Sequence, residues 1–193
     1  MDVDPDAGRR LSTPPLIPAS SRRDPLLATV RVALSAAMIG AVIFTAVTLV
    51  TIPLALLWRT RILAEVTSRG GLAVPPEFIW VICGICVLIA LTAGIGFLFL
   101  RELRRIVDTV AQGDPFIPDN AVRLQRMGWL AIAIQLIALP AGAMAGWASY
   151  MAHVHYLDIG VSIGGIFLAL ILFVLARIFR KGAAMRDELE GTV

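Results

Sequence analysis

Residues 32–58 read VALSAAMIGAVIFTAVTLVTIPLALLW, an uninterrupted run without Asp, Glu, Lys or Arg. An α-helix needs about 20 apolar residues to cross the hydrocarbon core of a bilayer. Three more charge-free stretches follow, at residues 78–100, 128–151 and 159–176. Backbone polar groups in lipid must be bonded within a helix or a closed barrel, and the alternation typical of barrel strands is missing from the sequence. The sequence therefore predicts an all-α membrane protein with four transmembrane helices.

The distribution of charge orients these four helices. The chain is 58% apolar and 16% charged, whereas soluble domains average about a quarter charged. Its 17 Lys and Arg residues lie outside the charge-free stretches: five before the first, three after it, five after the second, none after the third and four after the fourth. Since Lys and Arg accumulate in cytoplasmic loops, both termini are expected in the cytoplasm, with the chain in a bacterial inner membrane. No basic run is dense enough to follow a phosphate backbone, so direct nucleic-acid binding is not expected.

The segments that flank the first span differ in kind. Residues 1–28 contain five prolines among Asp, Ser and Arg, so they cannot bury enough apolar surface to offset their ordering entropy. A disordered cytoplasmic tail is predicted there, followed by a transmembrane domain over residues 29–193. After the span, Arg59 to about Ser68 has a helical pattern that Gly70 stops. Hydroxyl side chains within the span are expected to bond to backbone carbonyls of the same helix. They are Ser35, Thr45, Thr48 and Thr51.

The helical pattern of the second span continues beyond the membrane. Apolar side chains recur on one face until Gly113, which supplies a stop. Asp119 or Asn120 is expected to cap the next helix, which becomes the third span. A helical hairpin is therefore predicted at residues 101–127, and a similar apolar stripe extends the fourth helix into a tail at residues 177–193. These cytoplasmic extensions of helices 2, 3 and 4 form the predicted working surface.

Three short motifs lie in the hairpin and the tail. Gly-x-Pro-Phe-x-x-x-Asn precedes the third span, Phe-x-x-Gly follows the fourth, and an acidic segment closes on Thr-Val. Together they resemble a bacterial membrane family catalogued as domain of unknown function 2975, over roughly residues 30–193. Gly191 stands where many members have an apolar residue. The matching residues are Gly113, Pro115, Phe116, Asn120, Phe179, Gly182, Glu188, Leu189, Glu190, Thr192 and Val193.

The resemblance carries two expectations about this chain. It implies a four-helix membrane protein without an assigned reaction. Members are often encoded beside a small helix-turn-helix regulator of the Cro type, which implies membrane control of a transcription factor. The latter expectation rests on the family alone and not on the spacing of these residues.

Two residue patterns near the outer boundary have forms associated with chemistry. Cys83 and Cys86 have the spacing of a dithiol redox pair, but thiolates are disfavoured on an apolar helix, so a packing role is predicted. His153, His155 and Asp158 form a weak set of metal ligands, because structural sites normally have four placed ligands. They are interpreted as interfacial polar residues, and no metal or other cofactor is assigned.

Small residues recur at four-residue spacing near the outer ends of the third and fourth spans. The pairs are Gly142 with Gly146, and Gly160 with Gly164. Such pairs let membrane helices approach closely. A short loop joins the two spans, so the four glycines predict a closely packed antiparallel hairpin.

The spans lack the residues that most membrane chemistry requires. No Asp, Glu, Lys, Arg or His lies within the charge-free stretches, and Gln135 is their only strongly polar side chain, whereas pumps, carriers and intramembrane enzymes place ionisable groups there. A non-enzymatic regulator or scaffold acting on a cytoplasmic partner, such as a helix-turn-helix regulator, is predicted; a small transporter or channel component is the alternative. Whether Gln135 contacts a ligand, and the oligomeric state, stay open. The predicted partner surface comprises Arg104, Arg105, Phe116, Asn120, Arg123, Phe179 and Glu188.

Overall fold

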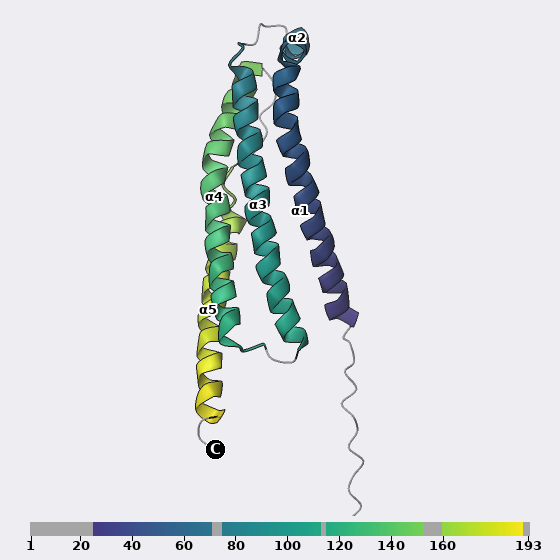
Figure 1. Ribbon diagram of the computed structural model, residues 1–193. Coiled ribbons are helices and arrows are strands. Elements are labelled where there is room, and N and C mark those ends of the chain that lie inside the picture. Colours follow the sequence, from purple (N-terminus) through teal and green to yellow (C-terminus); the bar gives the residue numbers. More distant parts are fainter. Residues whose placement is uncertain (1–24, 71–74, 113–114, 153–159, 191–193) are drawn as a thin grey trace, which may run out of the picture.

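The computed structural model describes residues 25–70, 75–112, 115–152 and 160–190, and within them the chain is entirely helical apart from short turns. Four of its helices are long and apolar enough to cross a membrane. The fifth, α2, is short and follows α1 after a single residue. The helices are α1 (Pro25–Leu57), α2 (Arg59–Gly70), α3 (Phe78–Ala111), α4 (Pro118–Ala152) and α5 (Ile163–Glu190) (Figure 1). The predicted all-α fold with four spans is confirmed.

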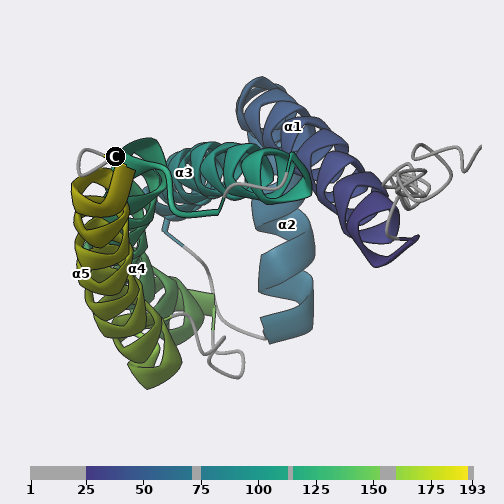
Figure 2. The same cartoon turned by 90° about the horizontal axis from the view of Figure 1, so that it is seen from below.

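The four long helices pack in a row. The extensive contacts join α1 to α3, α3 to α4 and α4 to α5. Viewed along the helices they form an open arc, with α1 and α5 at its two ends (Figure 2). The start of α1, the hairpin between α3 and α4, and the end of α5 share one end of the molecule (Figure 1). We call this the arginine-rich end; its described basic residues are Arg31, Arg101, Arg104, Arg105, Arg123, Arg126, Arg177, Arg180, Lys181 and Arg186.

Two apolar clusters join α3 to α4, and one of them extends to α5. One joins α3, α4 and α5 near the arginine-rich end, and the other joins α3 and α4 at the opposite end with side chains of α2 packed against it. Burial of such side chains and close van der Waals packing stabilise the helix contacts. The first cluster consists of Ile106, Leu124, Met127, Leu172 and Ala176. The second consists of Phe78, Val81, Ala148 and Ala152.

Local predictions around the first span are confirmed. The four predicted hydroxyl side chains, Ser35, Thr45, Thr48 and Thr51, each donate to the carbonyl four residues earlier, at 2.7–2.9 Å. The helix predicted after the first span is α2, which ends at Gly70 as expected. One boundary moves: α1 begins at Pro25, so residues 25–28 are helical and not part of a disordered tail. Proline suits a first helical position because its missing N–H would have had no partner. The rest of the predicted tail lies outside the described residues.

The hairpin forms as predicted, with a different start to its second helix. α3 continues to Ala111, and the Gln112 N–H closes it on the carbonyls of Thr109 and Val110. The predicted cap at Asp119 or Asn120 is wrong, because α4 already begins at Pro118. Asn120 is thus inside the first turn, where its N–H reaches the Ile117 carbonyl.

The register of α5 against α4 differs most from expectation. The Ser162 N–H bonds to the Gln135 side chain, and Gln135 lies midway along α4. α5 therefore begins halfway along α4 and is displaced toward the arginine-rich end (Figure 1). α5 as a whole is long enough to cross a membrane, but its charge-free part, from Ile163 to Ala176, covers only about 20 Å at 1.5 Å per residue.

This register contradicts the predicted packing of Gly160 and Gly164, whereas Gly142 on α4 is buried. Gly160 and Gly164 are exposed, and a Cβ at Gly160 would meet nothing within 4 Å. The close approach is at Gly165 instead, where a Cβ would collide with the Gln135 side chain. Closer to the arginine-rich end, Phe173 lies 3.0 Å from where a Cβ of Gly128 would be. Pairs of one large and one small residue therefore set the register of α4 and α5.

Candidate functional site

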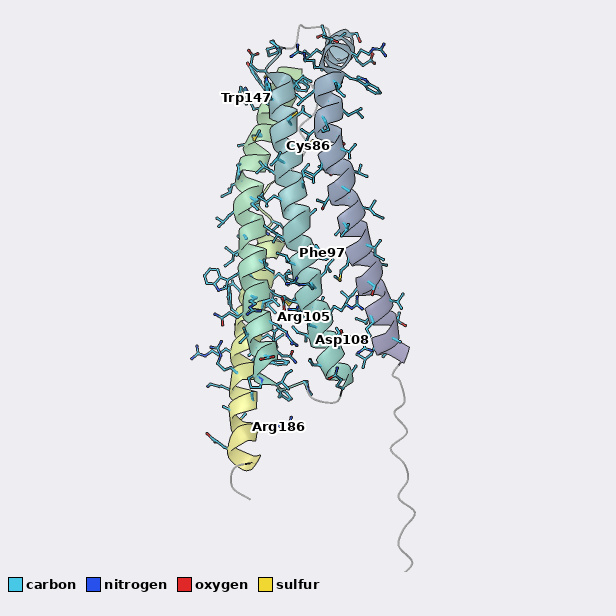
Figure 3. All side chains as sticks on the ribbon, viewed as in Figure 1. Cys86, Phe97, Arg105, Asp108, Trp147 and Arg186 are labelled. Atoms are coloured by element: carbon cyan, nitrogen blue, oxygen red, sulfur yellow. The ribbon has the colours of Figure 1, made fainter. Side chains whose placement is uncertain are left out.

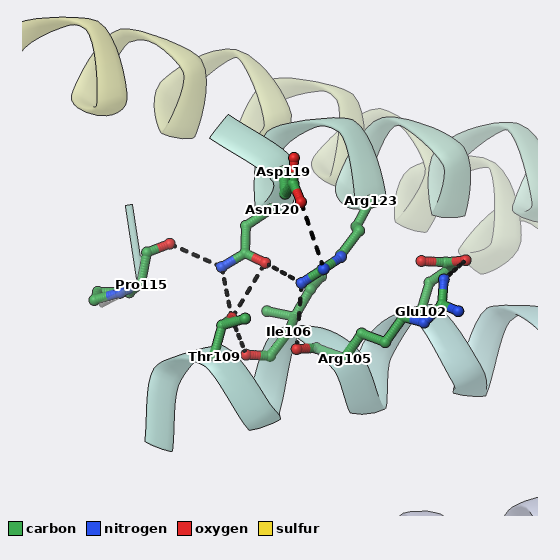
Figure 4. A network of polar contacts seen from close by, with 8 residues as sticks. All are labelled: Glu102, Arg105, Ile106, Thr109, Pro115, Asp119, Asn120 and Arg123. Atoms are coloured by element: carbon green, nitrogen blue, oxygen red, sulfur yellow. Dashed lines mark hydrogen bonds and ion pairs between the residues drawn. The ribbon is translucent and has the colours of Figure 1, made fainter. Parts of the chain in front are cut away.

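Asn120 is the centre of a polar network in the hairpin (Figure 4). Its side chain is fully buried, with no exposed surface. Its Nδ2 donates to Thr109 Oγ1 at 2.8 Å and to the Pro115 carbonyl at 3.0 Å, and its Oδ1 accepts from Arg123 Nη1 at 3.0 Å. Thr109 Oγ1 also lies 2.7 Å from the Ile106 carbonyl. A buried amide with these partners fastens the end of α3, the turn and the start of α4 into one unit.

Arg123 extends this network outward. Its Nη1 also lies 3.4 Å from the Arg105 carbonyl, and its Nη2 lies 3.8 Å from Asp119 Oδ2. The Arg123 side chain is 20% exposed, whereas that of Asp119 is 77% exposed. Arg123 therefore acts mainly inside the hairpin, and Asp119 faces solvent.

A second set of contacts joins the hairpin to α5. The rings of Phe116 and Phe179 pack with centroids 5.3 Å apart, and a Cβ on Gly182 would lie 2.9 Å from Phe116 Cδ1. The motif before the third span, which contains Phe116, thus contacts the motif after the fourth span, which contains Phe179 and Gly182. Phe116 keeps 44% of its surface exposed, so one side of the ring anchors α5 while the other is open.

The structure divides the predicted partner surface into two groups. Arg104, Arg105, Phe116 and Glu188 are exposed, whereas Arg123 and Phe179 are only partly so. Asn120 does not belong to the surface at all, because its amide is used up by the bonds that close the hairpin. A partner docking here could reach the first group without disturbing the network.

Glu102 is a buried carboxylate that sequence reasoning missed. It is 5% exposed; its Oε1 lies 3.2 Å from Arg105 Nη1 and 3.8 Å from Arg101 Nη2, while its Oε2 is buried without a hydrogen bond among the described residues. The signal was available: Glu102 follows Phe99 by three residues and precedes Ile106 by four, which puts it on the apolar face of α3. Glu102 lies two residues beyond the charge-free stretch 78–100, so it does not count as an ionisable residue within a predicted span.

A further ion pair fastens α1 at the same end. Arg31 Nε lies 2.8 Å from Asp108 Oδ1, with both side chains about two-fifths exposed. Asp108 is on α3 at its seam with α1 (Figure 3). The contact joins the first span to the hairpin, although an exposed pair contributes about 1 kcal/mol at most.

The two cysteines with the spacing of a redox pair lie on α3, on either side of a glycine that packs against α4. Cys83 is buried and Cys86 half-buried, and both are free thiols. Gly84 between them lies against Met144 of α4 so closely that a Cβ would collide with its side chain, which fits the predicted packing role. His153, His155 and Asp158 lie outside the described residues. Within the described part of the chain, no group of three or more potential ligands gathers.

Comparison with known proteins identifies a family. The family model described as "Protein of unknown function (DUF2975)" matches residues 64–193, which is more than half of the chain. The match begins within α2, so α1 lies outside it, whereas the resemblance in the sequence was drawn from about residue 30. No curated protein and no solved structure matches.

Proposed function

Since this chain belongs to the DUF2975 family, we propose that it is a non-enzymatic membrane regulator or scaffold that acts on a cytoplasmic partner. In this proposal the arginine-rich end faces the cytoplasm of a bacterial cell, in line with the accumulation of Lys and Arg on that side of membranes. The partner is a soluble protein, with a small helix-turn-helix regulator as the first candidate.

The observation that carries the proposal is the set of contacts that closes the hairpin and joins it to α5. The buried Asn120 closes the hairpin, and the Phe116–Phe179 contact fastens it to α5. Preorganised surfaces lose little conformational entropy when they bind. Arg104 and half of the Phe116 ring stay exposed on this unit, and arginine and aromatic side chains are the residue types that most often dominate binding energy.

A different observation favours the alternative, a small transporter or channel component. A cavity of about 370 Å³ lies between α1, α3 and α4, next to Gln135 and the non-helical residues Gly160 and Ser162. Non-helical backbone at membrane depth is tolerated where it lines a cavity or is buried in protein. The cavity has no ionisable residue in its lining, so we rank this function second.

The two functions are separated by charge-reversal variants at the arginine-rich end. Phe116→Ala is unsuitable, because it also removes the contact with Phe179. We expect Arg104→Glu to keep protein abundance and lose co-purification of the partner from native membranes. Arg61→Glu, on exposed α2 at the opposite end, is the matched control and should keep the partner. If both variants capture the same proteins as the parent, and none binds the purified chain directly, the regulator function is wrong.

A further inference from the structure

α4 and α5 carry matching stripes of side chains along one side of their seam. In each stripe successive residues are three or four positions apart, which keeps them on one helix face. Both stripes change from aliphatic through aromatic to polar toward the arginine-rich end. On α5 the stripe is Ile166, Leu170, Phe173, Arg177 and Arg180. On α4 it is Leu139, Leu136, Ile132, Trp129 and Gln125.

The aliphatic parts of the two stripes line a groove of about 420 Å³. Apart from Gln135, every residue in its lining is apolar. Next along the stripes, Trp129 and Phe173 meet edge to face with ring centroids 5.4 Å apart. Tryptophan favours the level of the lipid headgroups, because its ring and its N–H are satisfied there together. The aromatic pair therefore marks the boundary between the hydrocarbon and headgroup layers.

Two arginines follow directly after this boundary. Arg180 Nη2 donates to Gln125 Oε1 at 2.8 Å, so its partner is a neutral amide. Arg177 is exposed, and neither arginine has a carboxylate within ion-pair distance among the described residues. Guanidinium groups bind phosphate oxygens well. Beyond the last lining residue of the groove, Phe173, the α5 stripe continues to Arg177 and Arg180, and no described carboxylate pairs with either. This sequence of apolar and then basic side chains is complementary to a molecule with a hydrocarbon chain and an anionic head.

The distance along α5 from the aliphatic residues to the arginines matches the depth of one membrane leaflet. Arg177 lies eleven residues beyond Ile166, a rise of about 16 Å in a helix. One leaflet of a hydrocarbon core about 30 Å thick measures roughly half of that thickness. We propose that the α4–α5 groove binds an anionic phospholipid from the leaflet at the arginine-rich end, with one acyl chain along the groove and the phosphate at Arg177 and Arg180.

Trp129 offers a direct readout. Trp58, Trp80 and Trp147 are replaced by Phe, so that Trp129 is the only fluorescent tryptophan. The protein is placed in vesicles of phosphatidylglycerol and phosphatidylethanolamine in which one lipid or the other has brominated, and therefore quenching, acyl chains. Brominated phosphatidylglycerol should quench Trp129 at a several-fold lower mole fraction. Arg177→Gln and Arg180→Gln should each reduce the preference about tenfold, because each loses a charge-assisted hydrogen bond to the phosphate held at the site.

Arg104→Gln is the matched control, because it removes one exposed charge at the same end but on α3. It should leave the preference intact. Equal quenching by the two lipids at equal mole fractions would show ordinary bilayer contact and overturn the proposal. An equal loss in Arg104→Gln and Arg177→Gln would reduce the site to general charge attraction and also overturn it. Native mass spectrometry of the chain with all four tryptophans provides a second measurement, in which retained phosphatidylglycerol should fall in Arg177→Gln and Arg180→Gln but not in Arg104→Gln.

Discussion

At the scale of single residues, the hairpin depends on satisfying polar groups away from water. Asn120 has no exposed surface, yet each atom of its amide has a partner. Glu102 is the opposite case, since one of its carboxylate oxygens is buried without one among the described residues. A buried polar group that loses its partners carries the full desolvation cost, so these two side chains are not equivalent to the exposed charges around them.

Asn120→Ala should destabilise the protein by about 1–3 kcal/mol, because the Pro115 carbonyl and Arg123 lose buried hydrogen bonds. Thermal unfolding in detergent measures the change. Asp119→Ala is the control on the neighbouring residue; its carboxylate is 77% exposed, so its loss should cost less than about 1 kcal/mol. Equal effects of the two variants would contradict the role given to the network.

Replacing Cys83 and Cys86 with Ala should leave expression and partner binding intact, because both thiols are assigned to packing near Gly84. The double variant is compared with the parent for abundance in membranes and for co-purification. A variant that is abundant yet inactive would mean that the thiols have a chemical role, and the packing interpretation would then be wrong.

At the scale of helices, the contact between α4 and α5 rests on pairs of large and small side chains. Gly165 receives Gln135, Gly128 receives Phe173, and Gly182 receives Phe116 from the turn before α4. Three such pairs fix one register, because sliding α5 by a turn would set each large side chain against a residue with a Cβ. Close-packed interiors tolerate such overlap poorly.

Gly165→Ala and Gly164→Ala provide a matched test of this register. The added methyl group at Gly165 meets the Gln135 side chain and should cost about 1–3 kcal/mol. At Gly164 the nearest atom is the Ser162 hydroxyl at 3.5 Å, so alanine should be neutral or stabilise the helix by up to about 1 kcal/mol. Unfolding in detergent distinguishes them, and a larger cost at Gly164 would restore the contact predicted from four-residue glycine spacing.

At the scale of the whole molecule, the row of helices leaves α1 held by α3 and by the Arg31–Asp108 pair. Most of the α1 surface is apolar and exposed. In a membrane protein such a surface is in contact with lipid tails, so it needs no protein partner. The arginine-rich end carries more basic residues than the opposite end of the molecule. This difference predicts the orientation of the chain in the membrane.

Reporter fusions should place the arginine-rich end in the cytoplasm. Fusions after residues 115 and 190 should report a cytoplasmic location, and fusions after residues 70 and 155 an external one, because Lys and Arg resist transfer across the membrane. Alkaline phosphatase and green fluorescent protein give opposite signals on the two sides. A cytoplasmic signal at residue 155 would contradict the orientation.

The sequence alone determined the number of helices able to span a membrane, the short helix α2, the hydroxyl bonds of α1 and the helical hairpin. These features depend on local chemistry: a charge-free run of sufficient length must be a helix in lipid, glycine stops it, and a hydroxyl finds the nearest carbonyl. Only the tertiary structure decided that Asn120 and Glu102 point inward and that Gly165, not Gly160 or Gly164, meets α4. In lipid, an apolar side chain is equally satisfied against a helix or an acyl chain, so hydrophobic pattern does not reveal which face packs. Register comes instead from the fit of particular large and small side chains, which exists only once both helices are in place.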